Sequence, residues 1–175
     1  MNGIIDILED GDLRTIGRVA EAIKMVYDQP DLFPELIRAM AHTDPGVRMR
    51  ASDAVEKISR SNPDYLQPHK GFILDAVKGQ TQQEVRWHLA QIIPRLELSP
   101  KERSRVAGDL FKYLDDPSKI VQTNSLQALV DLAWEDDVLF QQVKAAVERL
   151  ADTGSPAVSN RASKLFLELD DQIDQ

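Results

Sequence analysis

The sequence predicts an all-α fold built from repeated helical hairpins, and three observations carry this prediction. First, a short sequence motif that begins with valine recurs at Val47, Val85, Val121 and Val158, at intervals of 38, 36 and 37 residues. A period of this length is typical of stacked helical hairpins, each of which buries its apolar face only against its neighbours. Second, apolar residues follow these valines at offsets near 4, 7, 8 and 11, which lie on one face of a helix. Third, no segment alternates polar and apolar residues for long enough to form a sheet.

The second helix of each expected hairpin follows from the valine pattern. An earlier, partial copy places Ile16, Ala20, Ile23 and Tyr27 on one face. Later helices are marked by a capping residue followed by proline, because proline is favoured at the first helical position, where its missing N–H costs nothing. We therefore expect the second helices near 13–27, 45–59, 83–96, 118–133 and 156–170.

The first helices of the hairpins fill the intervening stretches, at about 32–42, 63–79, 100–114 and 137–152. Ser99 and Glu102 around Pro100 fit a capping box. Pro68 should interrupt the helix opened by Pro63, and Pro94 should kink or end the helix in which it falls. We expect a single domain over 1–175 with about four to five hairpins, ending in an acidic tail over 170–175.

Composition excludes several classes of protein. There are no cysteines, which excludes a disulfide scaffold, a thiolate metal site and a cysteine nucleophile, and fits a reducing compartment. No signal peptide is visible, and no apolar run approaches the ~18 residues of a membrane span, so we expect a cytoplasmic protein. The net charge of −8 argues against a general nucleic-acid or membrane binder. Residues 45–105 nevertheless carry +4, between ends of −5 (1–44) and −7 (106–175).

The segment from Asp44 to Val55, with sequence DPGVRMRASDAV, resembles the second helix of a HEAT repeat. The shared features are the aspartate-proline opening, the valine-arginine pair and small residues where helices approach. The resemblance covers about 13–170, and the whole chain is similar to small bacterial HEAT-repeat proteins. It implies a right-handed α-solenoid, that is, an armadillo-like α-α superhelix, and implies no particular activity. It also implies that the arginine after the valine joins a structural ladder with acidic residues at helix starts, a role that fits Asp44, Arg48 and Arg86.

Helical geometry predicts which side chains face a partner. The position two residues after each valine lies almost opposite the buried face, and the position three residues after it lies on a flank. In HEAT-like stacks the second helices line a concave groove, so these rows would form its surface. Trp87 is the main candidate, unless distortion near Pro94 turns it inward. The expected groove residues are Trp87, Met49, Arg50, His88, Arg18, Asn124 and Arg161.

The favoured function is a non-catalytic scaffold or adaptor that binds a peptide, helix or acidic segment of another protein in this groove. No phosphate loop, metal-ligand spacing or catalytic motif is visible, so no enzyme, metal or cofactor is expected. One alternative is a nucleic-acid-binding protein like the HEAT-like DNA glycosylases, with Trp87, Asp53, Arg50 and Arg86 as the relevant set; the acidic total counts against it. A second alternative is a structural assembly component, although the acidic ends favour a monomer.

Overall fold

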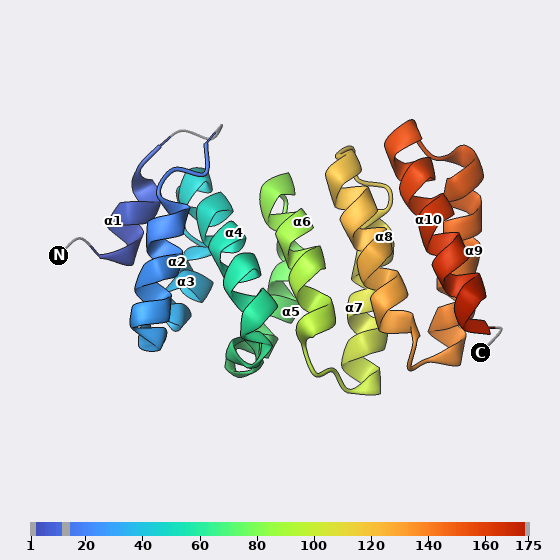
Figure 1. Cartoon of the computed structure of the whole chain (residues 1–175), viewed down its shortest axis with the longest axis horizontal. Helices are drawn as coiled ribbons and strands as arrows, with labels where there is room; N and C mark the ends of the chain where they lie inside the picture. The colour runs from blue at the N-terminus through green and yellow to red at the C-terminus, as the bar shows by residue number, and fades with distance from the viewer. Residues whose placement is uncertain (1–2, 12–14, 174–175) are drawn as a thin grey trace. The chain divides into compact units, whose positions relative to one another are not determined.

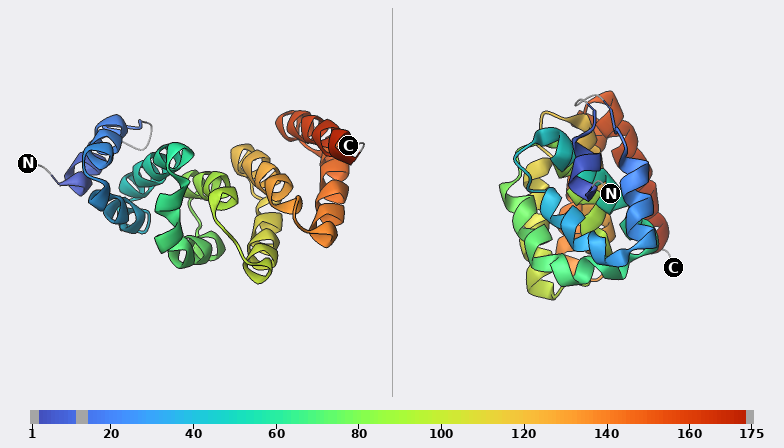
Figure 2. Two further views of the ribbon diagram at one scale, coloured as in Figure 1. Left: turned by 60° about the horizontal axis from the view of Figure 1, so that its bottom comes forward. Right: turned by 90° about the vertical axis from the view of Figure 1, so that its left-hand side faces the viewer.

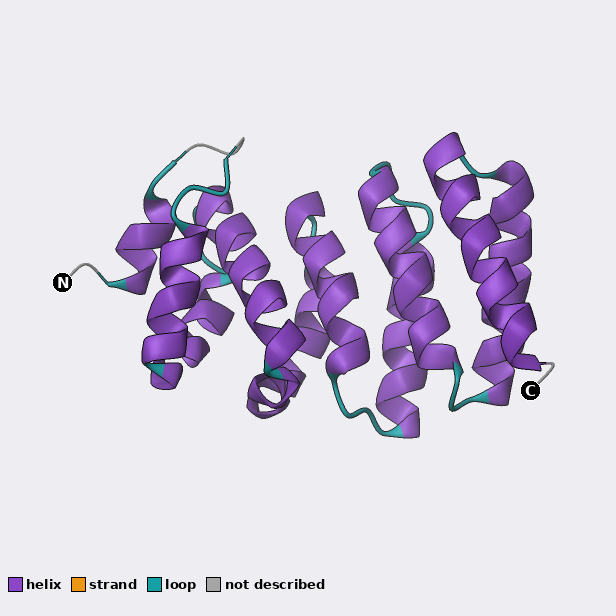
Figure 3. Ribbon diagram, viewed as in Figure 1, coloured by secondary structure: helices purple, strands orange, loops and turns teal. Residues whose placement is uncertain are grey.

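The structure of the chain, a computed structural model, describes residues 3–11 and 15–173. Over these residues its regular secondary structure is all helical, joined by loops, and contains no strand (Figure 1, Figure 3), which confirms the all-α prediction. The α-helices are α1 (Ile4–Glu9), α2 (Val19–Asp28), α3 (Phe33–Ala39), α4 (Pro45–Ser61), α5 (Lys70–Gly79), α6 (Gln83–Ile92), α7 (Pro100–Tyr113), α8 (Lys119–Ala133), α9 (Asp137–Thr153) and α10 (Pro156–Ile173). Three 3-10 helices are η1 (Pro30–Leu32), η2 (Pro63–His69) and η3 (Ile93–Arg95).

The helices form two compact units, unit 1 over 1–96 and unit 2 over 97–175. In unit 1, α4 is the central helix: it packs on α1, α2, α3 and α6, while α5 packs on α6. In unit 2, α8 packs on α7, α9 and α10, and α9 and α10 pack on one another at the C-terminal end (Figure 2). Among the described residues, no helix is both long enough and apolar enough to cross a bilayer.

The valine pattern correctly identifies the buried face of α4, α6, α8 and α10. The face expected for α2 is wrong: Ile16 and Tyr27 are exposed, and the helix buries Val19, Ala22 and Val26 instead. Val47, Val85, Val121 and Val158 are all fully buried. Each lies in the first turn or so of its helix, and the apolar residues that follow it at helical spacing are buried with it, except Phe166, which is half-buried. Burial of this repeated face, at roughly 25 cal/mol for each Å² of apolar surface, is the main force that packs each second helix on its neighbours.

The prolines and capping residues begin, interrupt or end helices at the positions expected from the sequence. The Asp44 carboxylate accepts hydrogen bonds from the backbone N–H groups of Gly46 (2.7 Å) and Val47 (3.0 Å), which fixes the start of α4. These bonds, the Val47 bond foremost, hold the pKa of Asp44 below its ordinary value. Around Pro68 the chain forms η2 rather than α-helix, and at Pro94 helix α6 gives way to η3.

The N-terminal part of unit 1 differs from expectation. Helix α2 begins at Val19 rather than near residue 13, and residues 12–14 lie outside the described part of the chain. The turn before α2 uses Gly17 at a φ of +51°, where an added Cβ would lie 2.2 Å from the Asp10 carbonyl oxygen. The short helix α1 was not predicted, because six residues are too few to give a periodic signal.

At the C-terminal end, α10 continues to Ile173, past residue 170, where the acidic tail was expected to begin. Residues 174–175 of that tail lie outside the described part of the chain. The side chain of Asp170 accepts a hydrogen bond from Lys144 of α9 at 2.9 Å. This bond gives the end of α10 a contact with its hairpin partner.

Candidate functional site

The residue that follows each repeat valine makes the same contact in three helices. Arg48 Nη1 donates to the His42 carbonyl at 2.7 Å, Arg86 Nε to the Gln80 carbonyl at 2.7 Å, and Gln122 Nε2 to the Asp116 carbonyl at 2.6 Å. In every case the acceptor lies six residues earlier in the chain. This side chain therefore binds a carbonyl group in the turn that leads into the second helix.

The predicted acid–arginine ladder takes a different form. Asp44 caps its own helix, and Arg48 Nε instead donates to the Gln82 side chain at 2.8 Å. Gln82 Nε2 in turn donates to the Pro45 carbonyl at 2.9 Å. The start of α6 is thus linked to the start of α4 through an amide, because glutamine offers both a donor and an acceptor where a carboxylate offers acceptors alone.

Two of the expected groove residues are buried, so the prediction that they face a partner is wrong. Arg50 is 1% exposed and its Nη1 donates to the Leu8 carbonyl, at the end of α1, at 2.7 Å. A Cβ on Gly11, Gly17 or Gly46 would come within 3.1 Å of the Arg50 side chain, so the backbone encloses this arginine closely. Met49 beside it is 9% exposed. Helices α1 and α2 both pack on α4.

The other expected groove residues belong to different units, and each makes a contact within its own unit. Arg18, in unit 1, binds Glu21 of the same helix turn at 2.6 Å. Asn124, in unit 2, donates to the Ile120 carbonyl at 2.9 Å, and Arg161 donates to the Gln127 side chain of α8. The flank position, three residues after the valine, therefore serves contacts within and between helices.

Trp87 and His88, the remaining two expected groove residues, are each only partly exposed. Trp87 is half-buried on α6, neither fully exposed nor packed inside, and its ring meets the His88 ring edge-on at 5.6 Å. The His88 side chain is 11% exposed; its Nδ1 lies 3.2 Å from Gln91 Oε1 and its Nε2 lies 3.9 Å from Asp53 Oδ1. Burial lowers the pKa of His88, against the opposing effect of the Asp53 carboxylate.

A charge cluster between α4 and α6 is the feature that the sequence analysis missed. Glu56 is 2% exposed, and its carboxylate accepts hydrogen bonds from Arg60 Nε at 2.9 Å, Arg60 Nη2 at 2.7 Å and Arg95 Nη2 at 2.6 Å. Arg95 Nη1 also donates to the Glu56 carbonyl and to Ser59 Oγ, both at 2.7 Å. Beside this group, Lys57 binds Asp53 at 2.7 Å.

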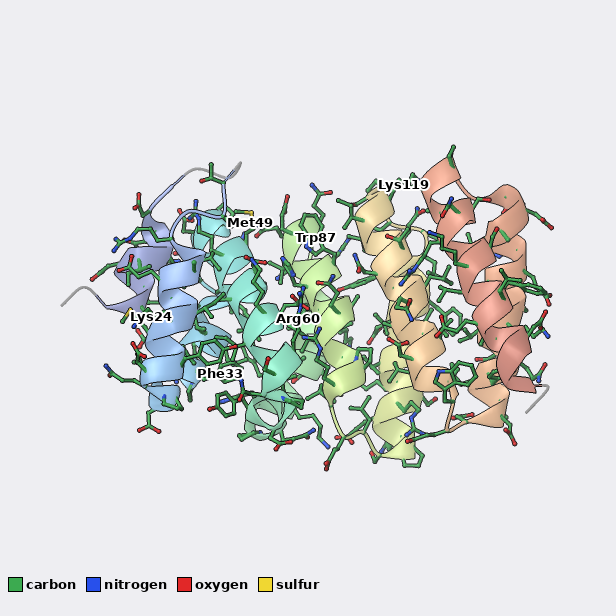
Figure 4. The ribbon with its side chains drawn as sticks, in the orientation of Figure 1. Lys24, Phe33, Met49, Arg60, Trp87 and Lys119 are labelled. Carbon is green, nitrogen blue, oxygen red and sulfur yellow. The ribbon has the colours of Figure 1, made fainter. Side chains whose placement is uncertain are left out.

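The electrostatics of this cluster follow from its hydrogen bonds. Burial opposes ionisation of Glu56, but the hydrogen bonds from Arg60 and Arg95 together outweigh it and hold its pKa below the ordinary value. The carboxylates lie beneath the surface, whereas the Arg60 side chain is 60% exposed. The outward face of the cluster is therefore cationic. Figure 4 shows Arg60 and Trp87 along the two neighbouring helices α4 and α6.

Part of this cluster was visible in the sequence as two pairs at a spacing of four, Asp53 with Lys57 and Glu56 with Arg60. Such pairs are usually solvent-exposed, and nothing in the sequence indicated that Glu56 would be buried. The third member, Arg95, follows Pro94 in η3, so helical periodicity could not place it.

The chemistry available elsewhere is limited. Within the described residues, no cluster of three or more His, Cys, Asp or Glu side chains is placed to bind a metal ion. Two residues of the set considered for a glycosylase-like site are not available to a ligand, because Arg50 is buried and Asp53 is bound by Lys57. In unit 2, a cavity of about 160 Å³ lies between α7 and α9, lined by Ser104, Ala107, Gly108, Phe111, Asp136, Val138, Leu139 and Gln142.

Comparisons with known proteins inform on the fold alone. A scan against protein-family models gave no match, and a search of curated proteins gave none. Among solved structures, the chain is similar to the crystal structure of an engineered protein, with a TM-score of 0.65 and 18% sequence identity. The match covers 96% of this chain and 78% of the engineered one. At this identity the likeness extends to the fold and carries no inference about activity.

Proposed function

We propose that this chain is a HEAT-like, right-handed α-solenoid in one domain, and that it serves as a cytoplasmic, monomeric, non-catalytic scaffold for another protein. Two observations support the architecture. The four repeat valines are all buried, and the residue after three of them binds a carbonyl six residues earlier. A recurring contact at one register is the expected mark of a repeat protein, in which each hairpin meets its neighbours in the same way.

The α4–α6 face of unit 1, defined by Trp87, His88, Lys57, Arg60 and Arg95, is the proposed partner-binding surface. The observation that carries this proposal is the half-buried Trp87, in contact with His88, on the same face as cations held in place by buried carboxylates. Tryptophan and arginine are the residues most enriched at the energetic centre of protein interfaces. Side chains on packed helices lose little further entropy on binding, so contacts made here translate well into affinity.

The proposal is tested by affinity capture from the source cell, with the full chain immobilised and the Trp87→Ala variant compared with wild type. We expect the recovery of specific partners to fall at least tenfold with Trp87→Ala, because truncation of an interface anchor typically costs 2 kcal/mol or more, at about 1.4 kcal/mol per factor of ten. Trp134→Ala is the matched control: Trp134 is 41% exposed, lies in unit 2 and contacts Phe140.

Both variants should keep the far-UV circular dichroism of the wild type. Equal capture by wild type and Trp87→Ala would refute the assignment of this face. Arg50 is unsuitable as a test residue, because it is buried against α1 and its replacement would perturb folding.

A further inference from the structure

We propose that the guanidinium groups of Arg60 and Arg95 form a receptor for one carboxylate side chain of the partner segment. This inference rests on the proposed function, and it adds the chemistry that the partner must present. The recognised feature is an aspartate or glutamate at a set distance from an apolar residue that contacts Trp87.

The two guanidinium groups converge on a single oxygen atom. Glu56 Oε1 accepts from Arg60 Nε at 2.9 Å and from Arg95 Nη2 at 2.6 Å. The buried Glu56 carboxylate thus fixes both arginines, and Ser59 Oγ accepts a further hydrogen bond from Arg95 at 2.7 Å. A long side chain normally loses rotamer entropy when it binds a ligand. Here much of that loss has already occurred on folding, which favours binding.

The arginines retain donors for a ligand. A guanidinium group has five N–H donors in a planar fork. The contacts of Arg60 with Glu56 use only its Nε and Nη2 atoms, and 60% of the side chain is exposed. The fork geometry matches a carboxylate, with which arginine forms paired, charge-assisted hydrogen bonds.

The charge of the cluster selects a single carboxylate. Arg60 and Arg95 carry two positive charges against the one negative charge of Glu56, and the neighbouring Lys57–Asp53 pair is balanced. One positive charge is therefore in excess, which one carboxylate neutralises. A nucleic acid would need several phosphate contacts, and the net charge of −8 on the chain opposes a polyanion.

The spacing of the partner motif follows from helix geometry. Trp87 and Arg95 are eight residues apart in α6 and η3, which corresponds to ~12 Å at ~1.5 Å per residue. An extended peptide advances ~3.3 Å per residue, so ~4 residues cover that distance. We expect the acidic residue to lie three or four positions from the apolar residue that contacts Trp87.

The test is selection of a random 12-residue phage-displayed peptide library on the immobilised full chain. The selected peptides are then re-bound to wild type, Trp87→Ala, Arg60→Gln and Lys24→Gln. Lys24→Gln is the matched control, because Lys24 forms an i,i+4 pair with Asp28 on α2 at 2.6 Å and its loss changes the net charge equally. Figure 4 shows Lys24 on α2, away from Trp87.

We expect peptides whose binding depends on Trp87 to be enriched in Asp or Glu three or four positions from an aromatic or aliphatic residue. Arg60→Gln should weaken them about tenfold, and so should Gln in place of the acidic residue, without an additive effect of the two changes. Lys24→Gln should bind them as wild type does. Circular dichroism and the unfolding midpoint verify that Arg60→Gln is folded.

Each remaining outcome is decisive. Trp87-dependent peptides without acidic enrichment would overturn the carboxylate receptor and leave the proposed function standing. Failure to select any Trp87-dependent peptide would count against the proposed function and, with it, this inference. Retention of a duplex oligonucleotide that Arg60→Gln abolishes would identify a nucleic-acid partner instead, and would also overturn the carboxylate receptor.

Discussion

Helices α4 of unit 1 and α8 of unit 2 can be aligned on their repeat valines, but they bury different types of side chain at equivalent positions. At 5, 9 and 12 residues after the repeat valine, α4 buries polar side chains where α8 buries apolar ones. All six side chains are almost completely hidden from solvent. The residues are Ser52, Glu56 and Ser59 in α4, and Leu126, Val130 and Ala133 in α8.

The comparison teaches that the fold does not require the charges in α4. Val130 fills in α8 the position that Glu56 fills in α4, and both helices form and pack. A buried ion pair contributes little net stability compared with apolar residues of similar size, because desolvation offsets most of the attraction. Glu56 is therefore better explained by what it positions, Arg60 and Arg95, than by the stability that it adds.

The largest effect is expected at the buried arginine of unit 1, compared with its counterpart in unit 2. Arg50 and Arg161 both lie three residues after a repeat valine, but Arg50 is fully buried and binds a main-chain carbonyl, whereas Arg161 is half-buried and binds Gln127. We expect Arg50→Met to lower the free energy of unfolding by about 3 kcal/mol, because a buried hydrogen bond to a charged group is lost. Arg161→Met should cost less than about 1 kcal/mol.

Urea unfolding measures both values, and hydrogen exchange resolves where the protein opens. Arg50→Met should accelerate exchange in α1 and α2, since the Arg50–Leu8 bond joins α1 to α4. If the two substitutions lowered the free energy of unfolding equally, the position of the arginine after the valine, rather than its burial, would determine its contribution to stability.

A smaller loss of stability is expected when the buried polar residue Glu56 of α4 is replaced by an apolar residue, as at the equivalent position of α8. Glu56→Ala should lower the free energy of unfolding by about 2 kcal/mol, since it leaves two arginines without their shared carboxylate. The cost is below that of a fully buried pair because Arg60 is largely exposed.

The double variant Glu56→Val with Arg95→Leu should recover to within about 1 kcal/mol of wild type, because an apolar pair replaces the ionic one. It should nevertheless fail to bind the selected acidic peptides. A double variant as unstable as Glu56→Ala would contradict the view that the charges serve a role other than stability.

The same contrast explains how far the sequence could predict the molecule. Valine spacing and the prolines located α4, α6, α8 and α10 to within a few residues, because those signals are local to each helix, whereas the partial copy that marked α2 placed its start too early. Burial of Met49 and Arg50 could not be read from α4 itself, since it depends on the contact of α1 and α2 with that helix. The Glu56 cluster likewise depends on η3, a segment without periodicity.

The smallest effect is a loss of stability on mild acidification, expected in unit 1 and not in unit 2. His42, His69 and His88, the only histidines of the chain, all belong to unit 1. His88 faces Asp53, Glu56 and Lys57 of α4, and burial gives it a pKa below its ordinary value of about 6.5 in the folded protein. The unfolded chain therefore binds more protons at mildly acidic pH, and this residue's contribution to stability is complete above pH ~6.5 and declines as pH falls through the folded pKa.

Hydrogen exchange at pH 7.5 and pH 5.5, corrected for the intrinsic rates, should detect this decline in α4 and α6 but not in α8 and α10. His88→Gln should remove most of the difference, because glutamine keeps the polar contact with Gln91 without titrating. The pKa of His69 is lowered as well, by burial and by Arg38, so His69→Gln is the necessary control. If His69→Gln rather than His88→Gln removed the loss in α4 and α6, the titrating group would lie outside the α4–α6 face. A loss of equal size in both units would instead indicate carboxylates, which both units contain.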